Sequence, residues 1–306
     1  MTRYALVDIG SNTVRMNIYD VMFEEKKSML VFSKSETLGL INHIENTCLT
    51  ENGIQKLIKT LRDFKLCAGS VLCDHFVCFA TASLREISNK DDVLFQIKNL
   101  LGIGIDIISG DEEALYNFYG LQKYFNVSTG LLIDIGGGSV EILSFCDGKP
   151  IKSTSEPIGS LALFSKYCSK IMPKYEELEV MIKYIDKKLE GISWLNAHFP
   201  SVFCIGGTAR TMARMHKVFN KDDNNVSGDI NGYKMKSEDI SALFNYYKND
   251  KKFFMGELLK LSPERVHTFI PGLLVYTRII KIITSEIVTV SSFGVREGYL
   301  INKIMN

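Results

Sequence analysis

The feature that most constrains the fold of this chain is a repeat of its opening segment, 126 residues further on. Val7–Gly10 reads Val-Asp-Ile-Gly, and Ile133–Gly136 reads Ile-Asp-Ile-Gly. In both copies a short apolar run precedes the turn and alternating apolar residues follow it, which is typical of two strands joined by a tight turn. Either the two hairpins are alike by chance, or the chain holds two domains of related fold that each open with this hairpin. We favour the second interpretation.

Length and composition agree with two globular domains. Of the 306 residues, 46% are hydrophobic and 23% are charged, and these values exclude a disordered, collagen-like or coiled-coil protein. At about 100–200 residues per domain, the length suits two domains. We expect an N-terminal domain over residues 1–124 and a C-terminal domain over residues 125–306, whose terminal helix is able to pack back on the first domain.

Charge and cysteine usage narrow the classes of function. The net charge of +1 argues against a dedicated binder of duplex nucleic acid. Residues 123–306 hold 24 Lys and Arg against 19 Asp and Glu, which suits an anionic ligand and equally a solvated surface. The seven cysteines are scattered without a C-x-x-C pair, and Asp8 interrupts any N-terminal signal sequence. We therefore expect a cytoplasmic protein with reduced thiols and no membrane partner.

Hydrophobic periodicity and turn residues predict the remaining elements of an α/β fold. Helices are expected over Glu51–Cys67, with Thr50 as N-cap, and over Asp91–Leu101, Glu112–Phe125, Tyr175–Leu189, Thr208–Val218, Ser237–Asn249, Phe254–Leu259, Gly272–Thr284 and Arg296–Ile304. Strands are expected over Tyr4–Val7, Val14–Ile18, Lys26–Ser35, His75–Ala80, Ile103–Ile108, Leu131–Asp134, Val140–Ile142, Val202–Ile205 and Thr289–Ser292. The polar segment Asp222–Gly232 is expected to be a loop.

The first turn has the composition of an anion-binding loop. Small residues let successive backbone N–H groups approach a phosphate, and hydroxyl, amide and guanidinium side chains add hydrogen bonds. An ordinary hairpin turn uses the same residue types, so the two interpretations are equally consistent with this segment alone. The candidates for phosphate binding here are Gly10, Ser11, Asn12, Thr13 and Arg15.

Three consecutive glycines make the second turn a stronger candidate. Glycines lose much backbone entropy on folding, and close approach of a phosphate is the usual reason for a bare backbone. A strand follows the turn, so it is neither a dinucleotide fingerprint nor a Walker loop. Asp134 and Glu141 flank it, and carboxylates that face phosphates commonly hold Mg²⁺. The phosphate-binding candidates here are Gly136, Gly137, Gly138 and Ser139.

Two further segments carry candidate residues. A strand ends and a helix begins at Gly206-Gly207-Thr208, where N–H groups would suit an anion; the alternative is an ordinary connection with Thr208 as N-cap. Ser109-x-x-Glu112 fits a capping box, in which Glu112 accepts from the Ser109 N–H. Glu113 is then either a base for an attacking water or a charge at the helix start, and the residues alone favour the second.

In this order and spacing, these segments resemble the exopolyphosphatase/guanosine pentaphosphate phosphohydrolase (Ppx/GppA) family throughout residues 1–306. The chain is similar to the short, two-domain form. It departs from the family where Val266-His267 replaces the usual Ala-Asp, a segment that we interpret as packing. The family belongs with actin, Hsp70 and the sugar-kinase-like ATPases, which implies two related actin-like (ribonuclease H-like) domains with an active-site cleft between them. The motifs are Asp8–Asn12, Ala80–Arg85, Ile108–Ala114, Asp134–Ser139, Cys204–Thr208, Glu264-Arg265 with Ile270–Gly272, and Gly294–Gly298.

The resemblance implies a role for each candidate residue. Glu113, the second glutamate of the Ser-Gly-x-Glu-Glu motif, would be the catalytic base. Arg85 and both turns would contact phosphates, and Gly206, Gly207 and Thr208 would line the wall of the second domain. The metal side of the site, for Mg²⁺ or Mn²⁺, would be formed by Asp8, Asp134 and Glu141.

The activity implied is hydrolysis of the terminal phosphate of linear inorganic polyphosphate, by in-line attack of a water that Glu113 activates with the help of Mg²⁺. Guanosine pentaphosphate (pppGpp) is the alternative substrate. A related kinase is disfavoured because no acceptor-sugar site is recognisable. A non-catalytic sensor of polyphosphate or nucleotide would predict loss of Glu113 or Asp134, and both are present. Substrate preference and formation of a homodimer stay open.

Overall fold

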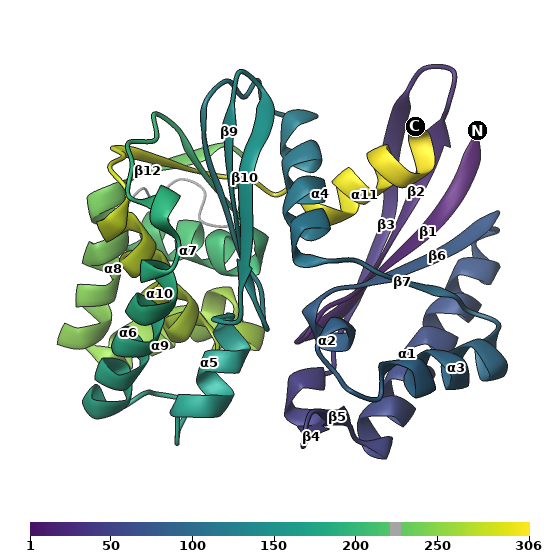
Figure 1. Cartoon of the computed structure of the whole chain (residues 1–306), viewed down its shortest axis with the longest axis horizontal. Helices are drawn as coiled ribbons and strands as arrows, with labels where there is room; N and C mark the ends of the chain where they lie inside the picture. Colours follow the sequence, from purple (N-terminus) through teal and green to yellow (C-terminus); the bar gives the residue numbers. More distant parts are fainter. Residues whose placement is uncertain (221–227) are drawn as a thin grey trace. The chain divides into compact units, whose positions relative to one another are not determined.

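The structure, a computed structural model, describes residues 1–220 and 228–306, which separate into two units (Figure 1). The first unit comprises Met1–Glu113 and Tyr299–Asn306, and the second comprises Ala114–Gly298. The chain passes between them inside helix α4 (Gly110–Gln122) and at the end of α11 (Val295–Tyr299).

The first unit is built on a five-stranded sheet of order β3-β2-β1-β6-β7. The antiparallel strands β1 (Thr2–Ile9), β2 (Thr13–Met22) and β3 (Lys27–Thr37) are followed by the parallel strands β6 (His75–Ala80) and β7 (Ile105–Ile107). The remaining elements of this unit are η1 (Leu40–His43), β4 (Ile44–Glu45), β5 (Cys48–Leu49), α1 (Glu51–Ser70), α2 (Ala82–Arg85), α3 (Lys90–Leu101) and the π-helical turn η4 (Leu300–Met305).

Helix α1 forms where the sequence predicts it and covers this sheet. The Thr50 hydroxyl accepts from the Gly53 N–H over 3.3 Å, which confirms the predicted N-cap. Apolar side chains at helical spacing, including Leu57 and Phe64, are buried in one cluster with the strand residues. The C-terminal Tyr299 also belongs to this unit, because its ring stacks on Phe79 with the centroids 4.6 Å apart.

The second unit repeats this topology. Its sheet has the order β10-β9-β8-β11-β13-β12, in which β8 (Gly130–Ile135), β9 (Val140–Cys146) and β10 (Lys149–Glu156) are antiparallel. Strands β11 (Val202–Ile205) and β13 (Ile287–Val290) then run parallel, and β12 (Tyr233–Lys236) closes the edge. The matching strand orders confirm the prediction of two related α/β domains. The helices are α5 (Ser160–Tyr167), α6 (Tyr175–Glu190), η2 (Ser193–Leu195), α7 (Gly206–Phe219), α8 (Ser237–Asn249), α9 (Lys251–Leu261), η3 (Pro263–Arg265) and α10 (Phe269–Ile282).

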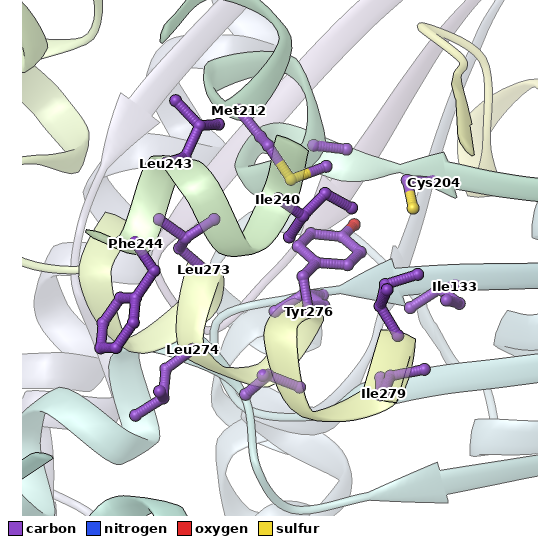
Figure 2. Packing of buried hydrophobic residues seen from close by; sticks show 14 of the residues in the cluster. Ile133, Cys204, Met212, Ile240, Leu243, Phe244, Leu273, Leu274, Tyr276 and Ile279 are labelled. Carbon is purple, nitrogen blue, oxygen red and sulfur yellow. The ribbon is translucent and has the colours of Figure 1, made fainter. Parts of the chain in front are cut away.

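Helix α10 lies in the centre of this unit's core and is apolar on nearly all sides. Figure 2 shows its Tyr276 and Ile279 near Ile133 and Cys204 of the sheet, and its Leu273 near helix α8; all these residues belong to one buried cluster. Burial on several faces explains why this segment is so apolar. Within the described residues, no helix is long and apolar enough to cross a membrane.

The structure corrects several predicted elements. Strand β10 and helix α5 were not predicted: β10 is a polar, largely exposed edge strand without apolar alternation, and α5 spans only eight residues. The predicted C-terminal helix is α-helical only to Tyr299, and its remainder is the π-helical turn η4. Of the predicted loop 222–232, residues 222–227 lie outside the described residues, and residues 228–232 are outside helices and strands.

Candidate functional site

The two repeated hairpins have turns of the same construction. The Gly10 N–H donates to the Thr13 carbonyl over 3.1 Å, and the Gly136 N–H donates to the Ser139 carbonyl over 3.0 Å. A Cβ atom on Gly10 or Gly136 would lie 3.1 or 3.2 Å from the same carbonyl oxygen. Glycine is therefore favoured at the first position of each turn for one shared steric reason.

In the first unit, the segment after β3 holds the carbonyl groups of the turn. The N–H groups of Leu38 and Gly39 donate to the Asn12 carbonyl over 3.0 and 2.9 Å, and the Ile41 N–H donates to the Ser11 carbonyl over 3.3 Å. The turn carbonyls are thereby directed towards the protein backbone.

In the second unit, the start of α5 does the same for the glycine turn. The N–H groups of Leu161 and Ala162 both donate to the Gly137 carbonyl over 2.9 Å, and the Gly159 N–H donates to the Gly138 carbonyl over 3.2 Å. A Cβ on Gly159 would lie 2.4 Å from the Gly138 carbonyl carbon, so only glycine permits this close approach.

While the carbonyls are anchored, two N–H groups at the tip of each turn donate to no acceptor within the described residues. Within the part of the chain that the structure describes, no hydrogen bond is donated by the backbone N–H of Ser11, Asn12, Gly137 or Gly138. Successive N–H groups of this kind form anion-binding concavities. Each unit thus carries one candidate phosphate turn, at the positions that the sequence repeat predicts.

Charged residues stand at equivalent positions beside the two turns. Asp8 pairs with Arg15 across β1 and β2, and Asp134 pairs with Glu141 across β8 and β9. Directly opposite residues of antiparallel strands lie on one face with Cβ atoms about 4.5–5.5 Å apart. The first unit therefore places a carboxylate beside a guanidinium, whereas the second places two carboxylates side by side.

The carboxylate of Glu141 is fully buried and is held by two hydroxyl groups. Its Oε1 accepts from Ser139 Oγ over 2.6 Å and from Ser155 Oγ over 2.7 Å. These donors offset part of the cost of burying a charge. Ser155 lies on β10, and because that strand was not predicted, its contact with Glu141 could not be predicted either.

Asp134 is held on two sides. Asn117 Nδ2, from α4, donates to Asp134 Oδ2 over 3.0 Å. Gly206 has a φ of +84°, and a Cβ there would lie 2.3 Å from Asp134 Oδ1.

Helix α7 begins at Gly206, and the Thr208 hydroxyl donates to the Ile135 carbonyl over 3.3 Å. The predicted start of this helix at Thr208 is therefore two residues too late, and the alternative in which Thr208 is the N-cap is excluded, because Ile205 occupies that position.

Arg265 is a charged neighbour of this site that the sequence interpretation treated as part of a packing segment. Its guanidinium lies against Gly207, where it would overlap any Cβ. Burial lowers the pKa of Arg265, while the negative charges of Glu264 and Asp134 act in the opposite direction. In the sequence, the Glu264-Arg265 motif of the family resemblance was the signal that could have identified Arg265 as a residue of the site. His267 does pack, with its ring edge-on to Phe164 at a centroid distance of 5.2 Å.

In the first unit, Glu112 and Glu113 have different partners. Glu112 accepts from the Ser109 N–H over 2.8 Å and its own N–H donates to Ser109 Oγ over 3.2 Å, which confirms the capping box. Glu113, only 8% exposed, accepts from Arg85 Nη1 over 3.0 Å. An ion pair with a guanidinium favours the ionised carboxylate. The structure thus brings together the two residues that the resemblance implied as base and phosphate ligand.

The carboxylates of the second unit have the chemistry that Mg²⁺ requires. Among the described residues, no group of three or more His, Cys, Asp or Glu side chains could hold a metal ion. Mg²⁺, however, usually keeps several waters and binds through one or two carboxylates together with substrate phosphates. The facing oxygen donors of Asp134 and Glu141 fit such an ion.

Two α/β units of one topology, each with an N–H-lined hairpin turn, define a two-domain protein of the actin-like class. The chain matches the model of the Ppx/GppA phosphatase family over residues 21–306 and belongs to that family. The resemblance seen in the sequence is confirmed, as is the expectation of a hydrolase.

Relatives match along almost the whole chain. "Exopolyphosphatase 1" of Mycobacterium leprae is 25% identical, covering 99% of this chain and 89% of its own length. A "Bifunctional 3-dehydroquinate synthase/phosphatase" of Fusobacterium nucleatum is 28% identical, over 99% of this chain and 46% of that protein. The crystal structure of an exopolyphosphatase from Cytophaga hutchinsonii, 21% identical, superposes with a TM-score of 0.85 over 99% of both chains. The Aquifex aeolicus family member, also 21% identical, gives 0.80 over 99% and 98%.

Proposed function

We propose that this protein is an exopolyphosphatase, which removes the terminal phosphate of linear inorganic polyphosphate and releases orthophosphate. The observation that carries the proposal is the pair of turns whose carbonyls are anchored and which each present two successive N–H groups without an acceptor among the described residues. Such N–H groups recognise phosphate oxygens without reading a base or a sugar, which suits a chain of identical phosphates. The name of the mycobacterial relative supports the same substrate.

In this proposal, the glycines of the second turn let a phosphate approach the backbone closely. Within the described residues, the glycines with positive φ are Gly39, Gly102, Gly148, Gly206 and Gly232. The three turn glycines are not among them, so their backbone conformation alone does not demand glycine. The proposed phosphate contacts are Gly10, Ser11, Asn12, Thr13, Arg15, Arg85, Gly136, Gly137, Gly138, Ser139, Gly206, Gly207 and Thr208.

Glu113 is the general base of the proposed reaction. It accepts a proton from a water whose oxygen forms a bond to the terminal phosphorus, while the bond from that phosphorus to the bridging oxygen breaks. Arg85 holds the Glu113 carboxylate through Nη1 and supplies positive charge for the phosphoryl oxygens. The N–H groups of the turns stabilise the charge that develops on these oxygens.

Asp134 and Glu141, paired across β8 and β9, would hold Mg²⁺ or Mn²⁺ together with waters and substrate phosphates. Asp8 of the first unit stays a predicted contributor to the metal side, because the described residues do not form a group of three metal ligands. A bound divalent cation supplies charge neutralisation for the phosphoryl oxygens. Ser139 and Ser155 fix the Glu141 carboxylate, and Asn117 fixes that of Asp134.

The decisive experiment compares phosphate release from long-chain polyphosphate, tripolyphosphate, pppGpp and ATP by the purified protein. We expect the highest kcat/KM for long polyphosphate, loss of turnover in excess chelator and recovery on addition of Mg²⁺. A higher kcat/KM for pppGpp would make the nucleotide the substrate. Absence of release from all four, with either Mg²⁺ or Mn²⁺, would refute a hydrolase of phosphoric anhydrides.

A further inference from the structure

We infer that Asn117 is a positioning residue that fixes the side chain of Asp134 for the divalent cation, a role that rests on the proposed function. Asn117 lies on α4 and is completely buried. Its Nδ2 donates to Asp134 Oδ2 over 3.0 Å, across 17 residues of sequence. The contact joins a helix of the second unit to the end of strand β8, where the glycine turn begins.

The carboxylate of Asp134 is oriented from both of its oxygens. The amide of Asn117 contacts Oδ2, and the bare backbone of Gly206 leaves room for Oδ1, which would lie 2.3 Å from any Cβ at that position. A rotation of the carboxylate would break the first contact. Hydrogen bonds of this type orient carboxylates that ligate metals, and their loss typically weakens metal binding.

Asparagine is a costly residue at this position if only stability is considered. Within the described part of the chain, Asn117 Oδ1 is buried and has no hydrogen-bond partner. It faces Gly294, where a Cβ would lie 2.9 Å from this oxygen. A buried acceptor without a donor destabilises the folded state, and an apolar side chain of similar volume would avoid that penalty. Such an apolar side chain could not donate the hydrogen bond that Asn117 Nδ2 gives to Asp134.

The amide of Asn117 is uncharged, which also suits a residue that positions Asp134 for a cation. A lysine or arginine at this position would neutralise Asp134 and compete with a cation. Asn117 orients the carboxylate and leaves its negative charge in place. Ala114, Phe118 and Leu121 of the same helix are buried in an apolar cluster, so Asn117 is a polar exception among the core-facing residues of α4.

The experiment compares Asn117→Leu with the wild-type protein in three measurements: the melting temperature, the affinity for Mn²⁺ measured by electron paramagnetic resonance of the free ion, and the Mg²⁺ concentration for half-maximal phosphate release. We expect an unchanged or higher melting temperature, and both metal measurements weakened by about 10–100-fold. Gln122→Leu is the matched control, because it removes from α4 an amide that donates to the Gly148 carbonyl over 2.6 Å. It should leave both metal measurements unchanged.

A purely structural role of Asn117 predicts the opposite pattern, a lower melting temperature with unchanged Mn²⁺ affinity, and that result would overturn the inference. Absence of Mn²⁺ binding by the wild-type protein would overturn it as well. Asn117→Ser, whose hydroxyl is too short to reach Asp134, provides a second variant and should lose Mn²⁺ affinity in the same way. If the wild-type protein hydrolyses none of the four substrates but Asn117→Leu still loses Mn²⁺ affinity, the proposed function fails and the positioning role stands.

Discussion

Arg85 Nη1 donates to Glu113 Oε2 over 3.0 Å and joins the end of α2 to the first turn of α4. The same nitrogen donates to the Ile108 carbonyl over 3.2 Å, which ties the guanidinium to the backbone just before α4. The two side chains are only 16% and 10% exposed, so loss of either one would leave a poorly solvated charge with less compensation. A proposed base and a proposed phosphate ligand are therefore one structural unit.

Glu113→Gln should lower turnover by about 10²–10⁴-fold, because the amide keeps the shape of the side chain but cannot accept a proton. Affinity for uncut polyphosphate should stay the same or rise, since a negative charge is removed. Phosphate release and polyphosphate binding are the measurements.

Glu112→Gln is the matched control for that variant. Its Oε1 can still accept from the Ser109 N–H, so it should cost less than about 1 kcal/mol of stability and keep most turnover. If Glu112→Gln were inactive and Glu113→Gln active, the roles of the two glutamates would be reversed.

Gly137→Val should weaken polyphosphate binding by at least about tenfold, because a β-branched side chain would occupy the place of a phosphate beside the N–H groups. Thermal melting should change little. Gly104→Val serves as the control, since a Cβ at Gly104 meets no atom within 4 Å. Equal polyphosphate affinities for wild type and Gly137→Val would show that the triple glycine serves the fold alone.

Gly206→Ala should destabilise the protein by about 1–2 kcal/mol through its left-handed backbone and, in addition, raise the Mg²⁺ concentration for half-maximal activity. The second effect follows because the new Cβ would displace Asp134 Oδ1. Gly232→Ala separates the two effects, since Gly232 has a similar φ of +78° and a Cβ there would only touch Phe125 at 3.7 Å. An equal rise of the Mg²⁺ concentration for half-maximal activity in Gly206→Ala and Gly232→Ala would contradict an effect through Asp134.

The half-buried His267 should make the protein less stable in mild acid. Burial, and then the charge of Arg265, lower the pKa of His267 below its usual 6.5. The unfolded chain therefore binds a proton at this histidine at a higher pH than the folded chain does. Stability from this group is complete above about pH 6.5 and is lost as the pH falls towards the folded-state pKa.

His267→Phe should flatten this pH dependence, while its ring still packs against Phe164. The measurement is the free energy of unfolding in urea at pH 7.5 and pH 5.5. His75→Phe, at an exposed position on β6, is the control and should keep the wild-type slope. Equal slopes for wild type and His267→Phe would exclude His267 as a source of acid sensitivity.

Local pattern was enough to predict much of the fold. The repeated Asp-Ile-Gly segments predicted two equivalent hairpins, since strand alternation and turn residues act over only a few positions. The bounds of β6 and α8 were predicted as the structure has them. The capping of α4 by Glu112 was also readable, because a capping box joins residues three positions apart.

Tertiary structure alone decided how the candidate residues are held. Asn117 meets Asp134, Ser155 meets Glu141, and Arg265 covers Gly207 only because helices and strands from distant parts of the chain pack together. Nothing in the neighbouring residues records these contacts, since side-chain direction at a packed interface depends on which elements meet and at what register. Even the start of α7 at Gly206 depends on a glycine placed against the carboxylate of another strand.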